Sequence, residues 1–304
     1  MNVCQSDVLK KSILEMVETE ISQPYLKEQL KQYVSFQSNN GFLFGELFIL
    51  HYQMFNGKMG QEVYKVAAAI EALILSFDIL DDFEDEDSLT NPWFNEPNLA
   101  LNATTALLFV SAKVIQNTQF HNKNEAIAML FEYALQSISG QHQDLLNIVR
   151  TEAEYIEMTM EKSGSLTKLA CMLGVVLATG DCPNEVKEYP RLIGLIGQIS
   201  NDILDLTTWE DKNDLVNKKY TLPIIYLLNH ADQKFQTIRD YYDGKVNVSE
   251  ILSKQQWIAQ DIIESGAITY TEVVKRVQQN KAMLEIGKLN VEQQYLAQLK
   301  KYIY

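Results

Sequence analysis

Apolar positions recur at helical spacing along most of the chain, and no segment alternates apolar and polar residues as a half-buried strand would. The pattern predicts helices at residues 8–34, 41–55, 66–87, 99–116, 123–139, 192–205 and 220–228, with shorter ones beyond. Between 139 and 192 it predicts an exposed helix that carries the glutamates of 152–161, followed by a small-residue helix that runs to Gly180. Proline predicts a break near Pro24 and a loop over 88–97, and the polar segment 207–219 predicts another loop. No repeat and no linker divides the sequence. We therefore expect an all-α fold in a single domain over residues 1–304.

An acidic run, residues 78–87, directly follows the apolar segment 66–77, which is rich in strong helix formers. A helix through both segments puts Asp78, either Asp81 or Asp82, and Asp85 on one face, because residues three and four apart are neighbours. Clustered carboxylates repel one another unless a cation lies between them. A solvated helix end is the ordinary explanation for such a run, but this one follows a helix that should be buried. The better explanation is a divalent cation such as Mg²⁺, which carboxylates, waters and substrate phosphates bind.

A second polar cluster follows the apolar run 192–196 and makes a metal site more plausible. Asn201 and Asp205 are four residues apart, with Asp202 on the same side of the predicted helix. All-helical cores bind metals with inward-facing side chains from facing helices. Two such sets could hold several metal ions, and the metals could hold a diphosphate.

The composition limits the possible partners. The formal net charge of −14 argues against nucleic acid or an anionic membrane surface, because both attract basic proteins. No stretch of eighteen consecutive apolar residues is present, so we expect no transmembrane span, and the first residues lack a signal-peptide pattern. The three cysteines (Cys4, Cys171 and Cys182) have no metal-ligand spacing and suggest reduced thiols in a cytoplasm.

Five segments carry a family resemblance. The run Asp81-Asp-Phe-Glu-Asp85 resembles the first aspartate-rich motif, DDxxD, of the trans-isoprenyl diphosphate synthases, the polyprenyl synthetase family. Four further elements of that family follow in order: Gly140-Gln141 with Asp144-Leu145, Lys162-Ser-Gly-Ser-Leu166, Gln198–Asp205 with Asn201 replacing an Asp, and Asp214–Pro223 with Lys219. The resemblance implies an isoprenoid-synthase helical bundle with a central cavity for metal ions and a diphosphate.

The resemblance also implies which residues bind the metals. Asp81 and Asp85 would ligate Mg²⁺ directly, while Asp82 would support them without direct ligation. Asn201 and Asp205 would hold a further ion from the opposite helix, with Asp202 assisting, so two or three Mg²⁺ ions are expected. Because Asn is a neutral ligand, that further ion should bind more weakly than in relatives with Asp there.

Polar and cationic side chains are expected to contact the diphosphate. In the family these positions neutralise or orient the donor's phosphate oxygens. By resemblance, Lys162 and Lys219 would neutralise diphosphate oxygens, and Gln141 and Gln198 would orient the carboxylates or the diphosphate. Lys212 is a further candidate in a loop that is shorter than in the family.

Two elements of the chain-elongating family members are missing. Those enzymes carry Gly-Gly-Lys-x-x-Arg-Pro upstream of the first motif and Arg-Arg-Gly after it. The corresponding places here are residues 56–60 and 87–92, and neither has an arginine. Lys58 is the one cationic residue of 56–60, and we assign it to substrate binding. Arginine binds two phosphate oxygens at once, so a second diphosphate, that of isopentenyl diphosphate, should bind poorly.

This combination resembles one subgroup, the bacterial competence-pheromone isoprenyltransferases, most closely over residues 70–87 and 164–180. The resemblance implies a cytoplasmic homodimer that transfers a geranyl or farnesyl group from its diphosphate to a tryptophan of a small quorum-sensing precursor peptide. In that subgroup indole C3 captures the allylic cation, and the peptide nitrogen then closes onto C2. Indole attacks such a cation without being deprotonated first. We therefore expect no strong base and hypothesise that the displaced diphosphate accepts the later proton.

The donor's tail requires an apolar tunnel along the helix of the first motif. In the family a bulky residue four or five positions before the first Asp blocks this tunnel. Phe77 lies four positions before Asp81 and Ser76 lies five before it. Phe77 taken alone is more readily explained as core packing, but at this position it predicts a short donor.

Two other classes of function remain open. One is a different enzyme on the same fold, either a short-chain isoprenyl diphosphate synthase or a terpene cyclase. The missing arginines count against the synthase, and Trp209 stands where a cyclase needs a Glu. The other is a non-catalytic subunit of a synthase, which the intact first motif disfavours.

Overall fold

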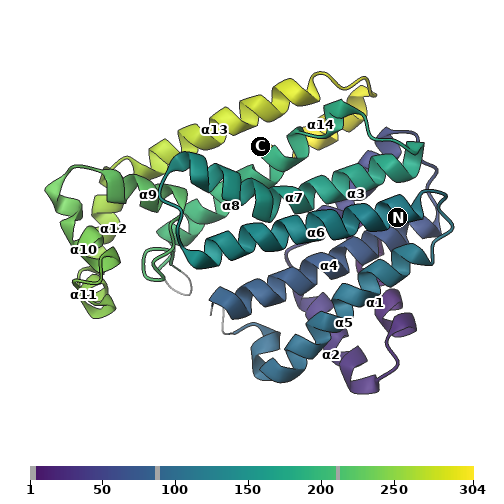
Figure 1. The fold of residues 1–304 in the computed structure, drawn as a ribbon, viewed down its shortest axis with the longest axis horizontal. Helices are drawn as coiled ribbons and strands as arrows, with labels where there is room; N and C mark the ends of the chain where they lie inside the picture. The colour runs from purple at the N-terminus through teal and green to yellow at the C-terminus, as the bar shows by residue number, and fades with distance from the viewer. Residues whose placement is uncertain (1–4, 86–89, 210–212) are drawn as a thin grey trace.

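The computed structural model describes residues 5–85, 90–209 and 213–304, and its regular elements are all helical (Figure 1). The α-helices are α1 (Gln5–Glu20), α2 (Pro24–Gln37), α3 (Leu43–Met54), α4 (Gln61–Asp85), α5 (Pro97–Gln116), α6 (Lys123–Leu146), α7 (Glu152–Thr179), α8 (Tyr189–Thr207), α9 (Leu222–Asn229), α10 (Gln236–Tyr242), α11 (Val248–Ser253), α12 (Gln255–Glu264), α13 (Ala267–Ile286) and α14 (Gln293–Lys300). Three short 3-10 helices are η1 (Pro92–Asn95), η2 (Asn184–Val186) and η3 (Gln233–Phe235). The described residues contain no strand, and the all-α prediction is confirmed.

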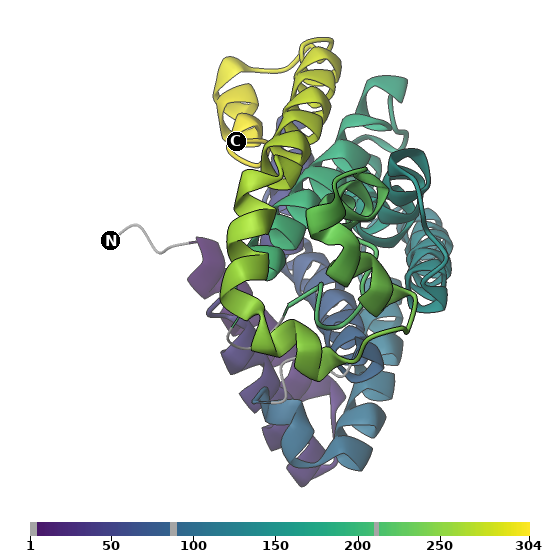
Figure 2. The same cartoon turned by 90° about the vertical axis from the view of Figure 1, so that its left-hand side faces the viewer.

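The long helices form a bundle with α7 at its centre. Helix α7 packs against α3, α6 and α8, and α4 packs against α1, α3 and α5. Figures 1 and 2 show these helices side by side, with α13 covering α8 from outside. Nearly uninterrupted burial along α7 from Gly164 to Leu177 explains its central place, because a helix that is apolar on all sides must be surrounded.

Two glycines allow helices to approach α7 closely. A Cβ on Gly140 of α6 would lie 2.3 Å from the main-chain nitrogen of Lys162, and one on Gly194 of α8 would lie 2.4 Å from Thr167 Oγ1. The sequence predicted that the helix from residue 123 ends at 139, and this is wrong, because α6 continues to Leu146. Gly140 is therefore a contact point between helices and not a helix end.

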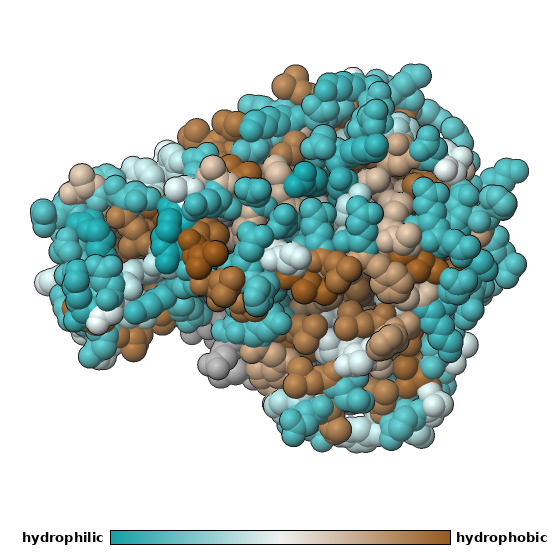
Figure 3. Space-filling view, in the orientation of Figure 1, coloured by the Kyte–Doolittle hydropathy of each residue, from teal (hydrophilic) through white to brown (hydrophobic). Residues whose placement is uncertain are grey.

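Helix α5 is long and apolar enough to cross a membrane by length and composition. Core helices of water-soluble enzymes meet the same two criteria, and the inner side of α5, with Ala103, Leu107 and Val114, is buried inside the bundle. Its outer side and that of α6 expose Leu101, Phe109, Phe131, Leu135 and Ile138. Figure 3 shows apolar side chains gathered over this part of the surface.

A second apolar cluster lies outside the main bundle. It joins the end of α8 to α9, α10, α11 and α12 through buried side chains that include Leu215, Ile224, Phe235 and Ile251. In Figure 1 these short helices extend beyond the ends of the long ones on the left. The segment that connects α8 to α9 contributes Leu215 to this cluster. The end of the same segment, at Lys219, lines the polar cavity described below.

Candidate functional site

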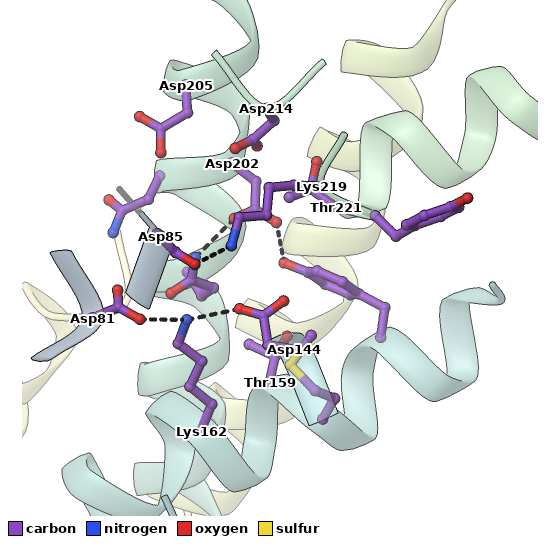
Figure 4. Close-up of a pocket in the computed structure, with 15 residues that line it drawn as sticks. Asp81, Asp85, Asp144, Thr159, Lys162, Asp202, Asp205, Asp214, Lys219 and Thr221 are labelled. Carbon is purple, nitrogen blue, oxygen red and sulfur yellow. Dashed lines mark hydrogen bonds and ion pairs between the residues drawn. The ribbon is translucent and has the colours of Figure 1, made fainter. Parts of the chain in front are cut away.

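A polar cavity of about 120 Å³ lies where α4, α7 and α8 meet (Figure 4). Its lining residues are Asp81, Asp85, Asp144, Tyr155, Met158, Thr159, Lys162, Gln198, Asn201, Asp202, Asp205, Asp214, Lys219, Tyr220 and Thr221. The structure thus brings the two predicted acidic clusters together, although more than a hundred residues separate them in sequence. Asp144, Asp214 and Tyr155 also line this cavity, and the sequence analysis gave them no role.

Lys162 connects α4 and α6 through two ion pairs. Its Nζ lies 3.1 Å from Asp81 Oδ1 and 2.8 Å from Asp144 Oδ2, and only 18% of the lysine side chain is exposed. Burial alone would lower the pKa of Lys162, but the negative charges of Asp81 and Asp144 outweigh it and hold that pKa above its usual range. The close contact at Gly140 positions α6 so that Asp144 reaches this lysine, and Figure 4 shows Lys162 between the two carboxylates.

Lys219 is ion-paired with Asp85, at the end of α4. The Asp85 side chain is only 6% exposed, and burial together with the charge of Asp81 raises its pKa, while Lys219 opposes the shift. Each carboxylate of the first motif that lines the cavity therefore has a lysine partner from another part of the chain.

The segment before α9 is held in place by side-chain amides. Asn213 Nδ2 donates hydrogen bonds to main-chain carbonyls at the end of α8, including that of Asp205 at 3.2 Å. Asn147, which ends α6 in a left-handed conformation, donates to the carbonyl of Lys218 at 3.0 Å. These contacts fix the backbone from which Lys219 extends. The sequence gave no signal for them, because a single Asn in a polar loop is unremarkable.

On α8, Asp202 is buried and bound by neighbouring side chains. The Tyr155 hydroxyl donates to its Oδ2, and Gln198 Nε2 donates to its Oδ1 at 2.8 Å. Burial raises the pKa of Asp202 to about 6, although these two hydrogen bonds oppose the shift. Asn201 and Asp205 line the cavity on either side of Asp202. Asp202 is thus positioned to hold Gln198 and Tyr155 as well as to assist a ligand.

The chemistry of the polar cavity suits a hard divalent cation. Six of its described lining residues are aspartates and two are lysines, so the lining has an excess of negative oxygen ligands. Within the described residues no three carboxylate, histidine or cysteine side chains already converge on one point. Mg²⁺ does not require such a closed set, because it usually binds one or two carboxylates together with waters and phosphate oxygens. The residues present therefore fit Mg²⁺ with a phosphorylated ligand.

A larger cavity of about 530 Å³ adjoins the polar one and has a mainly apolar lining. Its apolar side chains are Leu43, Phe44, Ile74, Phe77, Leu80, Leu108, Ile138, Leu145, Leu166 and Ile193. Asp81, Lys162, Gln198 and Asn201 line both cavities, so charged and apolar compartments meet at these four residues. Phe77 is on this wall as predicted for a tunnel, whereas Ser76 is buried and donates to the carbonyl of Leu73 at 2.6 Å.

Asp78 faces the larger cavity from α4, one helical turn before Asp81. The side-chain amide of Gln37, at the end of α2, donates a hydrogen bond to Asp78 Oδ2 at 2.9 Å. Burial, followed by the nearby charges of Asp81 and Asp82, raises the pKa of Asp78 to about 7. The sequence placed Asp78 on the acidic face but assigned it no role.

Two other predicted residues bind the surrounding structure. Asp82 Oδ2 accepts hydrogen bonds from Asn91 Nδ2 at 2.7 Å and Trp93 Nε1 at 2.9 Å, so it anchors η1 to α4 and lines neither cavity. Gln141 lines the larger cavity and donates to Glu84 Oε2 at 2.9 Å. Asp82 thus supports the end of α4, as expected of a residue that does not ligate metal.

Lys58 is not near the site, and its assignment to substrate binding is wrong. It is exposed and precedes α4, whereas Asp81 lies twenty residues beyond the start of that helix, about 30 Å along its axis at 1.5 Å per residue. The upstream segment that does reach the larger cavity is the start of α3, with Leu43 and Phe44. Lys212 lies outside the described residues.

Known proteins resemble this chain over most of its length. The sequence profile of the polyprenyl synthetase family matches residues 28–258. The tryptophan prenyltransferase ComQ of Bacillus subtilis subsp. natto (strain BEST195) is 35% identical over 294 residues, which cover 96% of this chain and 90% of that protein.

Solved structures show the same fold. The geranylgeranyl pyrophosphate synthase from Lactobacillus brevis has a TM-score of 0.81 at 18% identity, over 98% of this chain and 94% of its own. A polyprenyl synthase from Caulobacter crescentus, complexed with calcium and isoprenyl diphosphate, has a TM-score of 0.78 at 17% identity, over 97% of this chain and 92% of its own. At these identities the structural likeness concerns the fold alone.

Proposed function

The chain belongs to the polyprenyl synthetase family, and we propose that this prenyltransferase moves a geranyl or farnesyl group from its diphosphate to a tryptophan side chain of a small pheromone precursor peptide. The observation that carries the proposal is the junction of the two cavities. A polar compartment suited to metal and diphosphate opens directly onto an apolar one at Asp81, Lys162, Gln198 and Asn201. The 35% identity to a tryptophan prenyltransferase supports the choice of acceptor.

We propose that Asp81 and Asp85 from α4, with Asn201 and Asp205 from α8, hold two or three Mg²⁺ ions. When bound, these ions would act as Lewis acids toward the departing diphosphate. In the structure the ammonium groups of Lys162 and Lys219 are ion-paired with carboxylates. When the donor binds, these groups would turn to the diphosphate oxygens. The calcium and isoprenyl diphosphate bound to a protein of the same fold are consistent with this assignment.

The larger cavity is proposed to hold the donor's hydrocarbon tail. Ile193 lies eight residues before Asn201 on α8, so the cavity extends about 12 Å along the helices from the junction. Phe77 stands on its wall and, in this proposal, limits the length of the tail. Burial of an apolar chain against these side chains would supply binding free energy of about 25 cal/mol per Å² removed from water.

The charge distribution favours an uncharged acceptor over a second diphosphate. Among the described residues that line the larger cavity, Lys162 is the single lysine or arginine. Leu43 and Phe44, at the start of α3, present apolar groups where the acceptor would enter. An indole ring can pack on such a surface, whereas the diphosphate of isopentenyl diphosphate would find no arginine among the described lining residues and would share Lys162 with the donor.

We further propose that the enzyme is a cytoplasmic homodimer joined through α5 and α6. The outer sides of these helices expose large apolar residues, with Phe109 at 74% and Leu135 at 64% exposure. A contiguous exposed apolar surface of this kind is typical of a protein–protein interface. A double substitution, Phe109→Glu with Leu135→Glu, should halve the mass measured by light scattering. An unchanged mass would contradict this interface.

The proposed function can be tested by incubating the protein with Mg²⁺, geranyl or farnesyl diphosphate, and either isopentenyl diphosphate or a tryptophan-containing precursor peptide. Mass spectrometry would follow both products. A prenyl mass on the peptide, without a lengthened diphosphate, is expected. A lengthened diphosphate with an unmodified peptide would instead identify a chain-elongating synthase. Replacing the peptide's tryptophan by phenylalanine is the matched control and should abolish the mass shift.

A further inference from the structure

The wall of the larger cavity carries three carboxyl groups that have different partners. Asp81 is ion-paired with Lys162 at 3.1 Å. Glu84 is exposed and accepts a hydrogen bond from an amide side chain of α6. Asp78 lies one turn deeper than Asp81, and its hydrogen-bond partner is the neutral amide of Gln37. Asp78 is thus a carboxyl group that faces an apolar compartment and is paired with an amide and not with a lysine.

The reaction requires a proton acceptor in this compartment, if the proposed function holds. The C1–O bond of the donor breaks, and its electron pair leaves with the diphosphate. A C–C bond forms between C1 and indole C3, and the peptide nitrogen then bonds to C2. That nitrogen loses its hydrogen as H⁺, so each turnover yields modified peptide, diphosphate and one proton. The cyclisation step can be completed only when a base takes this proton.

The position of Asp78 matches this requirement. Asp78 and Asp81 are three residues apart on α4, about 4.5 Å along the helix axis, so Asp78 lies next to the junction where the donor's C1 would lie. It lines the cavity together with Leu43 and Phe44 of α3, and its partner Gln37 lies at the end of α2. An acceptor that enters beside Leu43 and Phe44 would pass Asp78 before it reaches the diphosphate.

We propose that Asp78 is a catalytic residue that takes the proton released from the acceptor peptide. Gln37 orients the carboxyl group through its hydrogen bond to Oδ2, and in this proposal Oδ1 would accept the proton of the peptide nitrogen. This assignment replaces the displaced diphosphate as the proton acceptor. In the proposed function the diphosphate would be held in the smaller cavity, whose lining includes Asp85, Asp205 and Lys219 and does not include Asp78.

The test separates loss of the leaving group from transfer to the peptide. Asp78→Asn keeps the shape of the side chain and its contact with Gln37 but cannot accept a proton. With donor and Mg²⁺ alone, diphosphate release to water should stay within about threefold of the wild type. With peptide present, formation of cyclised product should fall about 100-fold or more, the usual contribution of a general base. Asp78→Ala should regain part of its transfer activity when formate is added.

Glu71→Gln is the matched control. Glu71 is a buried carboxyl group on the same helix, but it accepts a hydrogen bond from Gly45 N at 2.5 Å and lines neither cavity. Its ratio of transfer to diphosphate release should equal that of the wild type. Another candidate base, His142, also lines the cavity, so His142→Gln should likewise leave the ratio unchanged.

Three outcomes would overturn the proposal. Wild-type transfer by Asp78→Asn would exclude a proton-accepting role, and an equal fall in diphosphate release and transfer would assign Asp78 to ionisation or to folding. If His142→Gln, and not Asp78→Asn, lowered transfer to the peptide while leaving diphosphate release unchanged, His142 would be the proton acceptor. Failure of the wild-type protein to modify any tryptophan peptide would instead reject the proposed function itself, together with this role for Asp78.

Discussion

The two cavities of this protein share four residues and otherwise have opposite linings. The smaller has aspartates and lysines from α4, α6, α7, α8 and the segment before α9, whereas the larger has mostly apolar side chains from α3 to α8. A substrate with a charged head and a hydrocarbon tail would fit both at once. In the proposed function the bundle would separate two tasks, stabilising a departing anion in one compartment and enclosing an apolar chain and its acceptor in the other.

The two compartments also differ in how their carboxyl groups are balanced. In the smaller cavity Asp81 and Asp85 have lysine partners. In the larger cavity Asp78 has a neutral amide partner. A lysine partner favours the ionised form of a carboxyl group and so opposes the effect of burial, whereas an apolar setting without such a partner favours the protonated form. The same helix, α4, supplies both kinds of carboxyl group.

The largest expected effect comes from changing the charge in the smaller cavity. Asp81→Asn should lower the rate of diphosphate release by at least about 100-fold, because a proposed metal ligand and a partner of Lys162 are lost. It should also remove the rise in melting temperature that Mg²⁺ with a donor analogue produces in the wild type. Steady-state kinetics and thermal unfolding with and without Mg²⁺ would measure both effects.

The adjacent Asp82 provides the contrast. Asp82→Asn removes a charged acceptor from Trp93 Nε1 and Asn91 Nδ2, so it should reduce stability by about 1.5–3 kcal/mol without Mg²⁺. The Mg²⁺-dependent shift in melting temperature should remain. If both variants lost that shift equally, the division between a ligand at Asp81 and an anchor at Asp82 would be wrong.

The next largest effect is expected on stability, at the contact between α6 and α7 beside Lys162. Gly140→Ala would place a Cβ 2.3 Å from the Lys162 nitrogen, so α6 must move away from α7 at a cost of about 1–3 kcal/mol. Gly197→Ala on α8 is the matched control, because no atom lies within 4 Å of its added Cβ and alanine favours a helix. Denaturant unfolding would measure both. Equal stability of the two variants would contradict a close contact at Gly140.

The sequence predicted the smaller cavity better than the larger one. Acidic runs behind apolar helices identify their own elements, and the motif containing Lys219 could be recognised, so the charged residues were found before any geometry was known. Asp78 was also visible in the acidic run, but its exposure to an apolar cavity depends on Gln37 and on the start of α3. Such contacts between distant elements leave no local pattern.

The wrong predictions have the same origin. Lys58 was assigned to the substrate because residues 56–60 occupy the place of a missing motif, but Lys58 precedes α4 and Asp81 lies twenty residues beyond the start of that helix. Gly140 was predicted to follow a helix end, since glycine weakens a helix interior, and packing against α7 overrides that preference. Sequence patterns describe the local chain, whereas both outcomes depend on which helices are neighbours.

A smaller effect on specificity should follow from a change in the larger cavity. Phe77→Ala enlarges the wall of the apolar compartment, so the preference for a longer donor should rise about tenfold. Competition between donors of different length, followed by mass spectrometry, would measure it. Phe83→Ala is the control, because Phe83 lines neither cavity. Its ring packs edge-on against that of Phe94, with 4.8 Å between the ring centroids. An unchanged preference in Phe77→Ala would remove the length-limiting role.

The smallest effect on catalysis is expected from Glu71, a carboxyl group on α4 that lies outside both cavities. Burial raises the pKa of Glu71 from 4.5 to about 8, so the folded protein binds this proton more tightly than the unfolded chain does. Its contribution to stability is therefore fully present below pH 4.5 and is lost as the pH rises toward 8. Glu71→Gln has no such proton, so its free energy of unfolding should depend less on pH. The slopes of the two proteins should differ by up to about 1.4 kcal/mol per pH unit. Unfolding free energies at several pH values between 5 and 9 would measure the difference. If the free energy of unfolding depended on pH in the same way for both proteins, Glu71 would be ionised in the fold. Glu71 would then be ionised like a carboxylate with a lysine partner, despite its burial on α4.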